Sequence, residues 1–189
     1  MTDSGADAFR RVVAALERRG IPFMLTGSFA SSFHGVPRAT QDIDLVIAPN
    51  EGQLRTLARD MLSNEFYVDE DAAIEAMRDE TLFNAIDQRT AWKIDFIICK
   101  SRPFSQQEFG RKYRVTFEGL TLWIATLEDV LIAKLEWASK GHSRRQIEDC
   151  AQLLRVRGMD LDRDYLSRWI ATLGVDSQWQ AAVNASQQT

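Results

Sequence analysis

The chain has 189 residues, of which 45% are hydrophobic and 26% are charged, and its formal net charge is −4. This length and apolar content predict one globular unit of one or two small domains with a sizeable core. The negative net charge argues against a protein that wraps nucleic acid through bulk positive charge, although it leaves room for local basic patches. No apolar run approaches the ~18 residues of a membrane span. The charged N-terminal segment does not resemble a signal sequence, so we expect a cytoplasmic protein.

Hydrophobic periodicity and the positions of glycine and proline predict the elements in chain order. The first part of the chain is predicted to contain a helix at 6–19, a strand at 22–25, a helix at about 28–33, a strand at 42–47 and a helix at 51–62. Next come a strand near 66–68, a helix near 71–77 and strands at 81–87 and 92–98. The polar residues 101–113 are predicted to form an exposed connection. Beyond them we expect a hairpin of strands 113–117 and 120–124, helices at 126–139, 143–157 and 162–173, and a weak helical tail from 177.

This order predicts an α/β (α+β) fold, a mixed sheet flanked by helices and followed by a helical C-terminal portion. We place the boundary near residue 126, which gives a first domain at 1–125 and a helical subdomain at 126–189. Cys99 and Cys150 lie far apart without metal-ligand spacing, and we expect both to be buried thiols. The five tryptophans share no stripe, so we expect them in the core or between the subdomains.

The most informative stretch is residues 26–47. Here a Gly-Ser pair, Gly27 and Ser28, ends one apolar run, and an acidic pair, Asp42 and Asp44, opens another. Side chains alternate along a strand, so both aspartates should lie on one face. Two adjacent carboxylates repel each other unless a cation lies between them, and hard oxygen ligands suit Mg²⁺. A turn of small residues entering a helix offers backbone N–H groups to a phosphate, so the stretch predicts a site for a metal-bound nucleoside triphosphate.

A third acidic candidate, Asp95, is the only carboxylate inside the apolar strand at 92–98. A charge buried in such a strand normally has a cation or hydrogen-bond donors beside it. If this strand lies next to the strand at 42–47, three carboxylates converge. That geometry suits phosphoryl transfer with two Mg²⁺ ions, in which one ion binds the triphosphate and the other, with Asp95, activates an attacking hydroxyl.

The combination of Gly27-Ser28, Asp42-Ile43-Asp44 and a later strand aspartate resembles the signature of the DNA polymerase β-type nucleotidyltransferase superfamily. More narrowly, residues 20–150 resemble small bacterial nucleotidyltransferases, including the AbiEii-like toxins of type IV toxin–antitoxin systems. The resemblance implies a nucleotidyltransferase-type sheet, with Gly27 and Ser28 binding the nucleotide phosphates. It also implies that Asp42, Asp44 and Asp95 are the catalytic residues and the ligands of Mg²⁺.

The predicted helix that follows the sheet is similar to a helix of the AbiEii-like members in which a lysine reaches the phosphates. Lys134 has apolar neighbours here, and we favour a phosphate contact for it over a snorkelling surface position. Downstream, Arg145 and Asp149 match a basic and an acidic position of that family and join the predicted nucleotide site, but Gln146 stands where the family has an acid. Whether these residues and Arg144 orient Lys134, touch the substrates or form an ordinary salt-bridged helix face stays open.

The loop before the aspartates should face the triphosphate. We predict a phosphate contact from Arg38, in preference to a solvated loop position, and place Thr40 in the same site. His34 has no second histidine at ligand spacing, so we expect a capping or structural role and no metal.

These features favour an enzyme that moves a nucleoside monophosphate from ATP or another NTP to an acceptor hydroxyl and releases pyrophosphate. By the resemblance, the acceptor is RNA, particularly the 3′ end of tRNA, or a protein; the enzyme is then a toxin, and a cognate antitoxin could be its partner. An RNA acceptor would need local basic patches such as residues 111–114 and 140–145. An antibiotic or another small molecule is the runner-up acceptor. A non-catalytic nucleotide- or partner-binding module on the same fold is the alternative.

Overall fold

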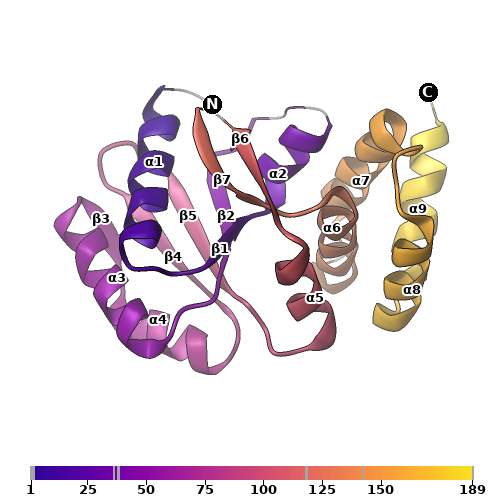
Figure 1. Ribbon diagram of the computed structural model, residues 1–189. Helices are drawn as coiled ribbons and strands as arrows, with labels where there is room; N and C mark the ends of the chain where they lie inside the picture. The colour runs from indigo at the N-terminus through magenta and orange to yellow at the C-terminus, as the bar shows by residue number, and fades with distance from the viewer. Residues whose placement is uncertain (1–2, 36, 38, 118, 142, 189) are drawn as a thin grey trace.

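The computed structural model describes residues 3–35, 37, 39–117, 119–141 and 143–188. Its elements occur in the order α1 (Asp3–Arg18), β1 (Phe23–Leu25), α2 (Gly27–His34), β2 (Asp42–Ile47), α3 (Glu51–Ser63), β3 (Phe66–Val68), α4 (Glu70–Arg78), β4 (Leu82–Asp87), β5 (Lys93–Ile98), α5 (Pro103–Arg111), β6 (Tyr113–Phe117), β7 (Leu120–Ile124), α6 (Leu127–Gly141), α7 (Arg144–Arg157), α8 (Arg163–Leu173) and α9 (Asp176–Gln187). In Figure 1 the sheet lies between α1 and α3 on one side and α2, α5 and α6 on the other. Helices α7, α8 and α9 form an outer layer beyond α6.

The described strands form one mixed seven-stranded sheet of order β3-β4-β5-β2-β1-β7-β6. The pairs β2–β5 and β1–β7 are parallel, and the other neighbours are antiparallel. Strands β2 and β5 pair along their whole length, with Asp44 opposite Asp95 and Ile47 opposite Ile98. The predicted mixed sheet is therefore confirmed, and the two strands are neighbours, which meets the condition under which the three carboxylates converge.

The core is built from the faces that the sequence pattern predicted. Phe9 and Leu16 of α1 are almost fully buried and belong to the same cluster as Leu25 of β1 and Leu45 of β2. Burial of each such side chain contributes about 1.5–3 kcal/mol. Because this cluster continues without a break to Ala182 in α9, the proposed division at residue 126 stays a prediction.

The predicted exposed connection at residues 101–113 is wrong, because most of it forms helix α5. Pro103 occupies the first turn of this helix, where a missing N–H costs nothing. The buried side of the helix carries Phe104, Ser105 and Glu108. One aromatic and two polar residues do not produce an apolar stripe, so periodicity missed the helix.

The weak tail expected from residue 177 is a regular helix, α9, that packs on α7. Ala182 is its only buried residue among those described, which explains the faint amphipathic signal. Arg155 of α7 ties down its C-terminal end by donating hydrogen bonds to the carbonyl oxygens of Ala185 at 2.6 Å and Ser186 at 3.1 Å. The hydrogen bonds from the Arg155 side chain therefore hold the end of α9 in addition to the burial of Ala182.

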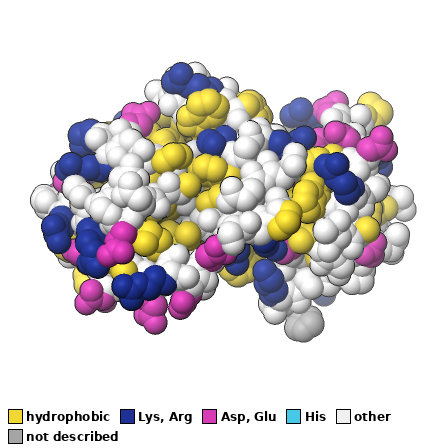
Figure 2. Space-filling view, turned by 60° about the horizontal axis from the view of Figure 1, so that its bottom comes forward, with side chains coloured by type: hydrophobic (Ala, Val, Ile, Leu, Met, Phe, Trp, Pro, Cys, Tyr) yellow, Lys and Arg dark blue, Asp and Glu magenta, His cyan; other side chains and the backbone are white. Residues whose placement is uncertain are grey.

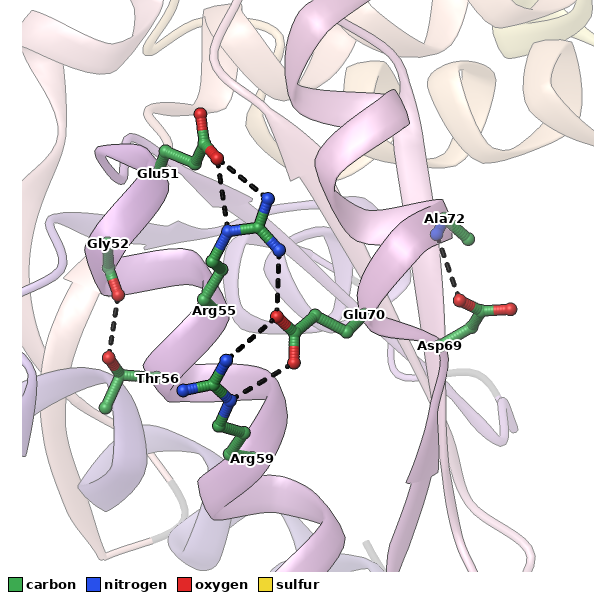
Figure 3. Close-up of polar contacts among 8 residues, drawn as sticks. All are labelled: Glu51, Gly52, Arg55, Thr56, Arg59, Asp69, Glu70 and Ala72. Atoms are coloured by element: carbon green, nitrogen blue, oxygen red, sulfur yellow. Dashed lines mark hydrogen bonds and ion pairs between the residues drawn. The ribbon is translucent and has the colours of Figure 1, made fainter.

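On the side of the sheet that carries α1 and α3, charged side chains connect α3 to α4 (Figure 3). Arg55 Nη1 lies 2.9 Å from Glu70 Oε1, and Arg59 Nε lies 3.3 Å from Glu70 Oε2. Asp69 caps α4 by accepting a hydrogen bond from the backbone N–H of Ala72 at 3.0 Å. Partly exposed pairs of this kind contribute at most about 1 kcal/mol each, so they orient the two helices without dominating their stability.

The tryptophans and cysteines are only partly where we expected them. Trp92 and Trp169 are buried, whereas Trp123 and Trp137 are exposed side chains and so correct that expectation. Cys150 is buried and Cys99 is half-buried, and both are free thiols. None of the helices within the described residues is long and apolar enough to span a membrane.

Candidate active site

The paired aspartates open strand β2 as its alternation predicts. Ile43 and Leu45 are completely buried, while Asp42 is exposed and Asp44 is half-buried on the opposite face. On the neighbouring strand, Asp95 lies directly opposite Asp44 in the parallel register. The structure therefore brings the three predicted carboxylates together on one face of two adjacent strands.

Gly27 begins helix α2 directly against Asp44. Its φ of +62° lies in the left-handed region, which glycine adopts without strain. A Cβ atom built on Gly27 would lie 2.0 Å from Asp44 Oδ2, so any other residue at this position would displace the Asp44 carboxylate. The backbone N–H of Ser28 donates a hydrogen bond to the same carboxylate oxygen at 3.4 Å. The Gly-Ser turn thus directs the helix N-terminus at the acidic pair.

The electrostatics of the three aspartates favour a cation. Burial and the negative charge of Asp95 raise the pKa of Asp44 to about 6, and the Ser28 N–H and the positive charge of Lys134 only partly offset this. Asp95 accepts hydrogen bonds from Lys93 Nζ at 2.9 Å and from the side-chain amide of Asn84. The sequence prediction missed both donors. Lys93 lies two residues before Asp95 on the same strand face, a spacing from which the contact could have been inferred.

Lys134 is a buried cation held by two side chains of α7. Its exposed fraction is 4%, and its Nζ lies 2.7 Å from Asp149 Oδ2 and 3.1 Å from Gln146 Oε1. Gln146 is therefore a neutral acceptor that shares the Lys134 ammonium with Asp149. Arg145 is exposed at the rim of the cavity, whereas Arg144 points to solvent and pairs with Glu148 at 3.5 Å. Of the four residues, Asp149 and Gln146 orient Lys134, and Arg144 belongs to a salt-bridged helix face.

A cavity of about 530 Å³ connects most of the predicted site. The predicted residues that line it are Gly27, Ser28, Asp42, Asp44, Asp95, Lys134 and Arg145. Thr40 is not one of the lining residues, but its hydroxyl accepts a hydrogen bond from the N–H of Asp42, which is one, at 3.2 Å. Arg38 lies outside the described residues. His34 is buried with Nε2 2.8 Å from the Ala125 carbonyl oxygen, which fits its predicted structural role.

The cavity extends beyond the predicted residues into a part that sequence reasoning missed. Arg102, Glu108, Glu136, Trp137 and Lys140 line this part. They come from α5, which was not predicted, from its N-cap residue Arg102, and from the later turns of α6. Lys134 and Trp137, three residues apart on α6, face the same side of the helix, and this spacing was the one available signal.

The three carboxylates have the donor atoms of a cation site but do not form a complete ligand set by themselves. Among the described residues, no three histidine, cysteine, aspartate or glutamate side chains are gathered closely enough to form a complete metal-binding set. The donor chemistry nevertheless fits a divalent cation, because Asp42, Asp44 and Asp95 supply hard oxygen atoms from one face of the sheet. The Asp44–Asp95 repulsion described above is the feature that a cation would relieve.

Comparison with known protein families decides the identity of the chain. The family model described as nucleotidyl transferase AbiEii toxin, type IV toxin–antitoxin system, matches residues 11–184. The chain belongs to the AbiEii nucleotidyltransferase toxin family. As a member of the AbiEii family it is an enzyme that transfers nucleotides. A search of curated proteins finds no match.

Solved nucleotidyltransferase structures share the fold of this AbiEii family member. The solution structure of the antibiotic-resistance factor ANT(2″)-Ia is 16% identical over 100% of both chains, with a TM-score of 0.61. ANT(2″)-Ia in complex with adenylyl-2″-tobramycin is 14% identical over 98% of both chains, with a TM-score of 0.50. An antigenic nucleotidyltransferase-like protein from Paracoccidioides brasiliensis is 16% identical over 97% of this chain and 94% of its own, with a TM-score of 0.55. At these identities the likeness shows the fold alone.

Proposed function

We propose that this AbiEii family member uses Mg²⁺ to transfer a nucleoside monophosphate from an NTP, such as ATP, to a hydroxyl of RNA, in particular tRNA, or of a protein. We further propose that it acts in the cytoplasm as a toxin that a cognate antitoxin neutralises. The observation that carries the proposal is the convergence of the Gly27 turn, the three aspartates and Lys134 on one cavity. No single one of these features requires a nucleotide, but a triphosphate uses all of them.

The proposed roles follow from the position of each side chain. Gly27 lets the start of α2 approach the Asp44 carboxylate closely, and the Ser28 N–H and the Lys134 ammonium would supply positive charge to a phosphate bound there. Asp42, Asp44 and Asp95 would hold Mg²⁺, which supplies charge neutralisation for the triphosphate and lowers the pKa of the attacking hydroxyl.

In the transfer step, the acceptor oxygen bonds to the α-phosphorus while the bond from that phosphorus to the pyrophosphate oxygen breaks. The hydroxyl proton must leave toward a base, and we assign this role to the carboxylate of Asp95. Burial opposes the charge of Lys93, but Asp95, which Lys93 contacts at 2.9 Å, raises the pKa of Lys93, so a cation lies beside the proposed base.

The surface suits an RNA acceptor only locally. Basic and acidic side chains are interspersed over the face shown in Figure 2. Arg111, part of one predicted basic patch, pairs with Glu128 and Asp129 and is therefore committed within the protein. Arg145 remains as an exposed cation beside the active site. The fold shared with ANT(2″)-Ia keeps a small-molecule acceptor as the second candidate.

The acceptor is best identified by following the label. The enzyme is incubated with Mg²⁺, each α-³²P-labelled NTP, and either total tRNA or an RNA-free protein extract, and the products are separated. The proposal expects label in RNA or protein, and none with the Asp42→Ala/Asp44→Ala variant. Label that enters only a small-molecule fraction would transfer the assignment to the second candidate. A double variant that retains full activity would overturn the proposed site.

A further inference from the structure

One face of the sheet is open to solvent beside the active site. Along β3, β4 and β5, buried side chains alternate with side chains that are exposed or half-buried. The buried set faces α3 and α4, which lie beside β3 and β4 (Figure 1). The opposite set shares its face with Asp95. We call this surface the open face, and outside the aspartate it consists of Tyr67, Leu82, Asn84, Ile86 and Lys93.

Apolar side chains occupy much of the open face. Tyr67 of β3 is 57% exposed, Ile86 of β4 is 42% exposed, and the two are register partners. Side chains directly opposite each other on antiparallel strands have Cβ atoms about 4.5–5.5 Å apart, so these two adjoin. Leu82, also exposed, lies four residues before Ile86 on the same face and lines the active-site cavity. Exposed apolar side chains that adjoin one another, unlike those scattered singly, point to a surface that another molecule covers.

The open face leads directly to the carboxylates. One row of register partners runs from Tyr67 through Ile86 to Lys93. The row continues to Asp42 of β2, the first of the three aspartates. Asp95 lies two residues after Lys93 on the same face of β5. The open face is therefore continuous with the proposed reacting centre.

The charges of the open face disfavour a nucleic acid. Lys93 is the single lysine or arginine in the sequences of β3, β4 and β5, and its Nζ lies 2.9 Å from Asp95 Oδ2. In the turn between β4 and β5, Arg89 pairs with Asp7 and Glu65. A polyanion binds through cations that neutralise its phosphates, and the described residues of these three strands offer it no unpaired cation. A protein segment with apolar side chains has no such requirement.

The geometry of the sheet sets the spacing of the groups that such a segment would carry. Ile86 and Asp95 are diagonal neighbours on adjacent strands, which places their Cα atoms about 7–8 Å apart. Tyr67 is one strand further away, at about 12 Å from Asp95, because neighbouring strands lie about 4.8 Å apart. An extended chain advances about 3.3 Å per residue, so residues two and four positions from a group at Asp95 reach about 7 and 13 Å. Both residues face the same way as that group.

We propose that the open face binds an extended segment of a protein acceptor, with a serine, threonine or tyrosine hydroxyl of that segment at Asp95. Apolar side chains two and four residues away on the segment cover Ile86 and Tyr67. The hydroxyl oxygen bonds to the α-phosphorus of the NTP as the bond to pyrophosphate breaks, and the hydroxyl proton passes to the Asp95 carboxylate. The product is a phosphodiester between the acceptor side chain and the nucleoside. This inference rests on the proposed nucleotidyl transfer and selects a protein over RNA as the acceptor.

Nine-residue peptides test the proposed spacing. Each peptide has a central serine, threonine or tyrosine, and two otherwise identical series carry leucine or alanine at the second and fourth residues on both sides of it. The kcat/KM for label transfer from each α-³²P-labelled NTP is measured with Mg²⁺. Wild type should use the leucine peptides about tenfold better than the alanine peptides, the order expected for burial of apolar side chains. In an RNA-free protein extract, mass spectrometry should find apolar residues at the same positions around the modified side chains.

Substitutions on the open face test whether this surface sets the preference. Tyr67→Thr and Ile86→Thr remove exposed apolar surface and keep a residue that suits a strand. Each should lower the leucine-to-alanine ratio about threefold, and the double variant should bring the ratio close to one. Trp123→Thr is the matched control, because Trp123 is a 38% exposed aromatic residue of the same sheet but lies on β7, away from the open face. It should leave the ratio unchanged.

The outcomes separate this inference from the proposed function. Labelled peptides or extract proteins with the apolar spacing, and a preference that Tyr67→Thr and Ile86→Thr reduce, support the open face. Label that enters tRNA or a small molecule alone would overturn the inference and leave nucleotidyl transfer intact. Labelled peptides or proteins without the apolar spacing would also overturn it, as would an equal loss of preference in Trp123→Thr. Absence of label from every acceptor would overturn the proposed function itself and the inference with it.

Discussion

Replacing Gly27 by alanine should inactivate the enzyme far more than it destabilises the fold. The left-handed backbone at this position costs a non-glycine residue about 1–2 kcal/mol. The added Cβ would also lie 2.0 Å from Asp44 Oδ2, closer than the 3.0 Å below which Cβ contacts essentially do not occur. The Asp44 carboxylate must therefore move by about 1 Å, and a misplacement of that size can reduce catalysis about a hundredfold.

Gly174→Ala provides a matched control for this prediction. Gly174 has a φ of +65°, at the C-cap of α8, and a Cβ atom there would meet nothing within 4 Å. The unfolding free energy measured in urea should fall by a similar amount, about 1–2 kcal/mol, in both variants. In Gly27→Ala, relaxation around Asp44 comes in addition to this shared loss. Only Gly27→Ala should lose about a hundredfold in kcat for pyrophosphate release. If the two variants kept equal kcat values, the close approach of Gly27 to Asp44 would not matter for the reaction.

Two further predictions concern buried charges. Lys134→Met removes the ammonium from the buried carboxylate of Asp149 and should cost about 3–5 kcal/mol in urea unfolding. The double variant Lys134→Met/Asp149→Asn should recover part of that stability without recovering activity, and full recovery of activity would refute the role of Lys134. Because the pKa of Glu108 in the fold is about 8 and its ordinary value is 4.5, its contribution to stability is complete below pH 4.5 and is lost as pH rises through 8. Between about pH 5 and pH 9 wild type should therefore lose about 4 kcal/mol more unfolding free energy than Glu108→Gln, and parallel stability curves would contradict the burial of an ionisable Glu108.

The catalytic face could be predicted from sequence because it depends on short-range patterns. Asp42 and Asp44 alternate with buried residues, and Gly27 marks a turn. The few residues around each position were therefore enough to predict its place in the site. The pairing of β2 with β5 required only the inference that two apolar strands with aspartates are neighbours. These features follow from strand alternation and turn chemistry.

The part of the cavity beyond the aspartates could not be predicted, because its walls come from segments distant in the chain. Glu108 belongs to a helix whose sequence resembles a polar loop, and its burial follows from packing against α6 and α8. A tryptophan is expected in the core because its side chain is large and apolar. Trp137, near the end of α6, nevertheless is half exposed and lines the cavity. The contact between Lys134 and Gln146 could not be predicted either, because nothing in the sequence indicates that a glutamine will contact a lysine twelve residues earlier.

The most direct test of the central claim is pyrophosphate release from NTPs in Mg²⁺ by wild type and by Asp44→Asn, with the acceptor identified by labelling. Asparagine keeps the shape of the side chain but removes the charge that would bind the cation, so Asp44→Asn should fold normally and lose activity at least about a hundredfold. A folded Asp44→Asn variant that releases pyrophosphate at a rate close to that of wild type would contradict the role of Asp44 as a metal ligand.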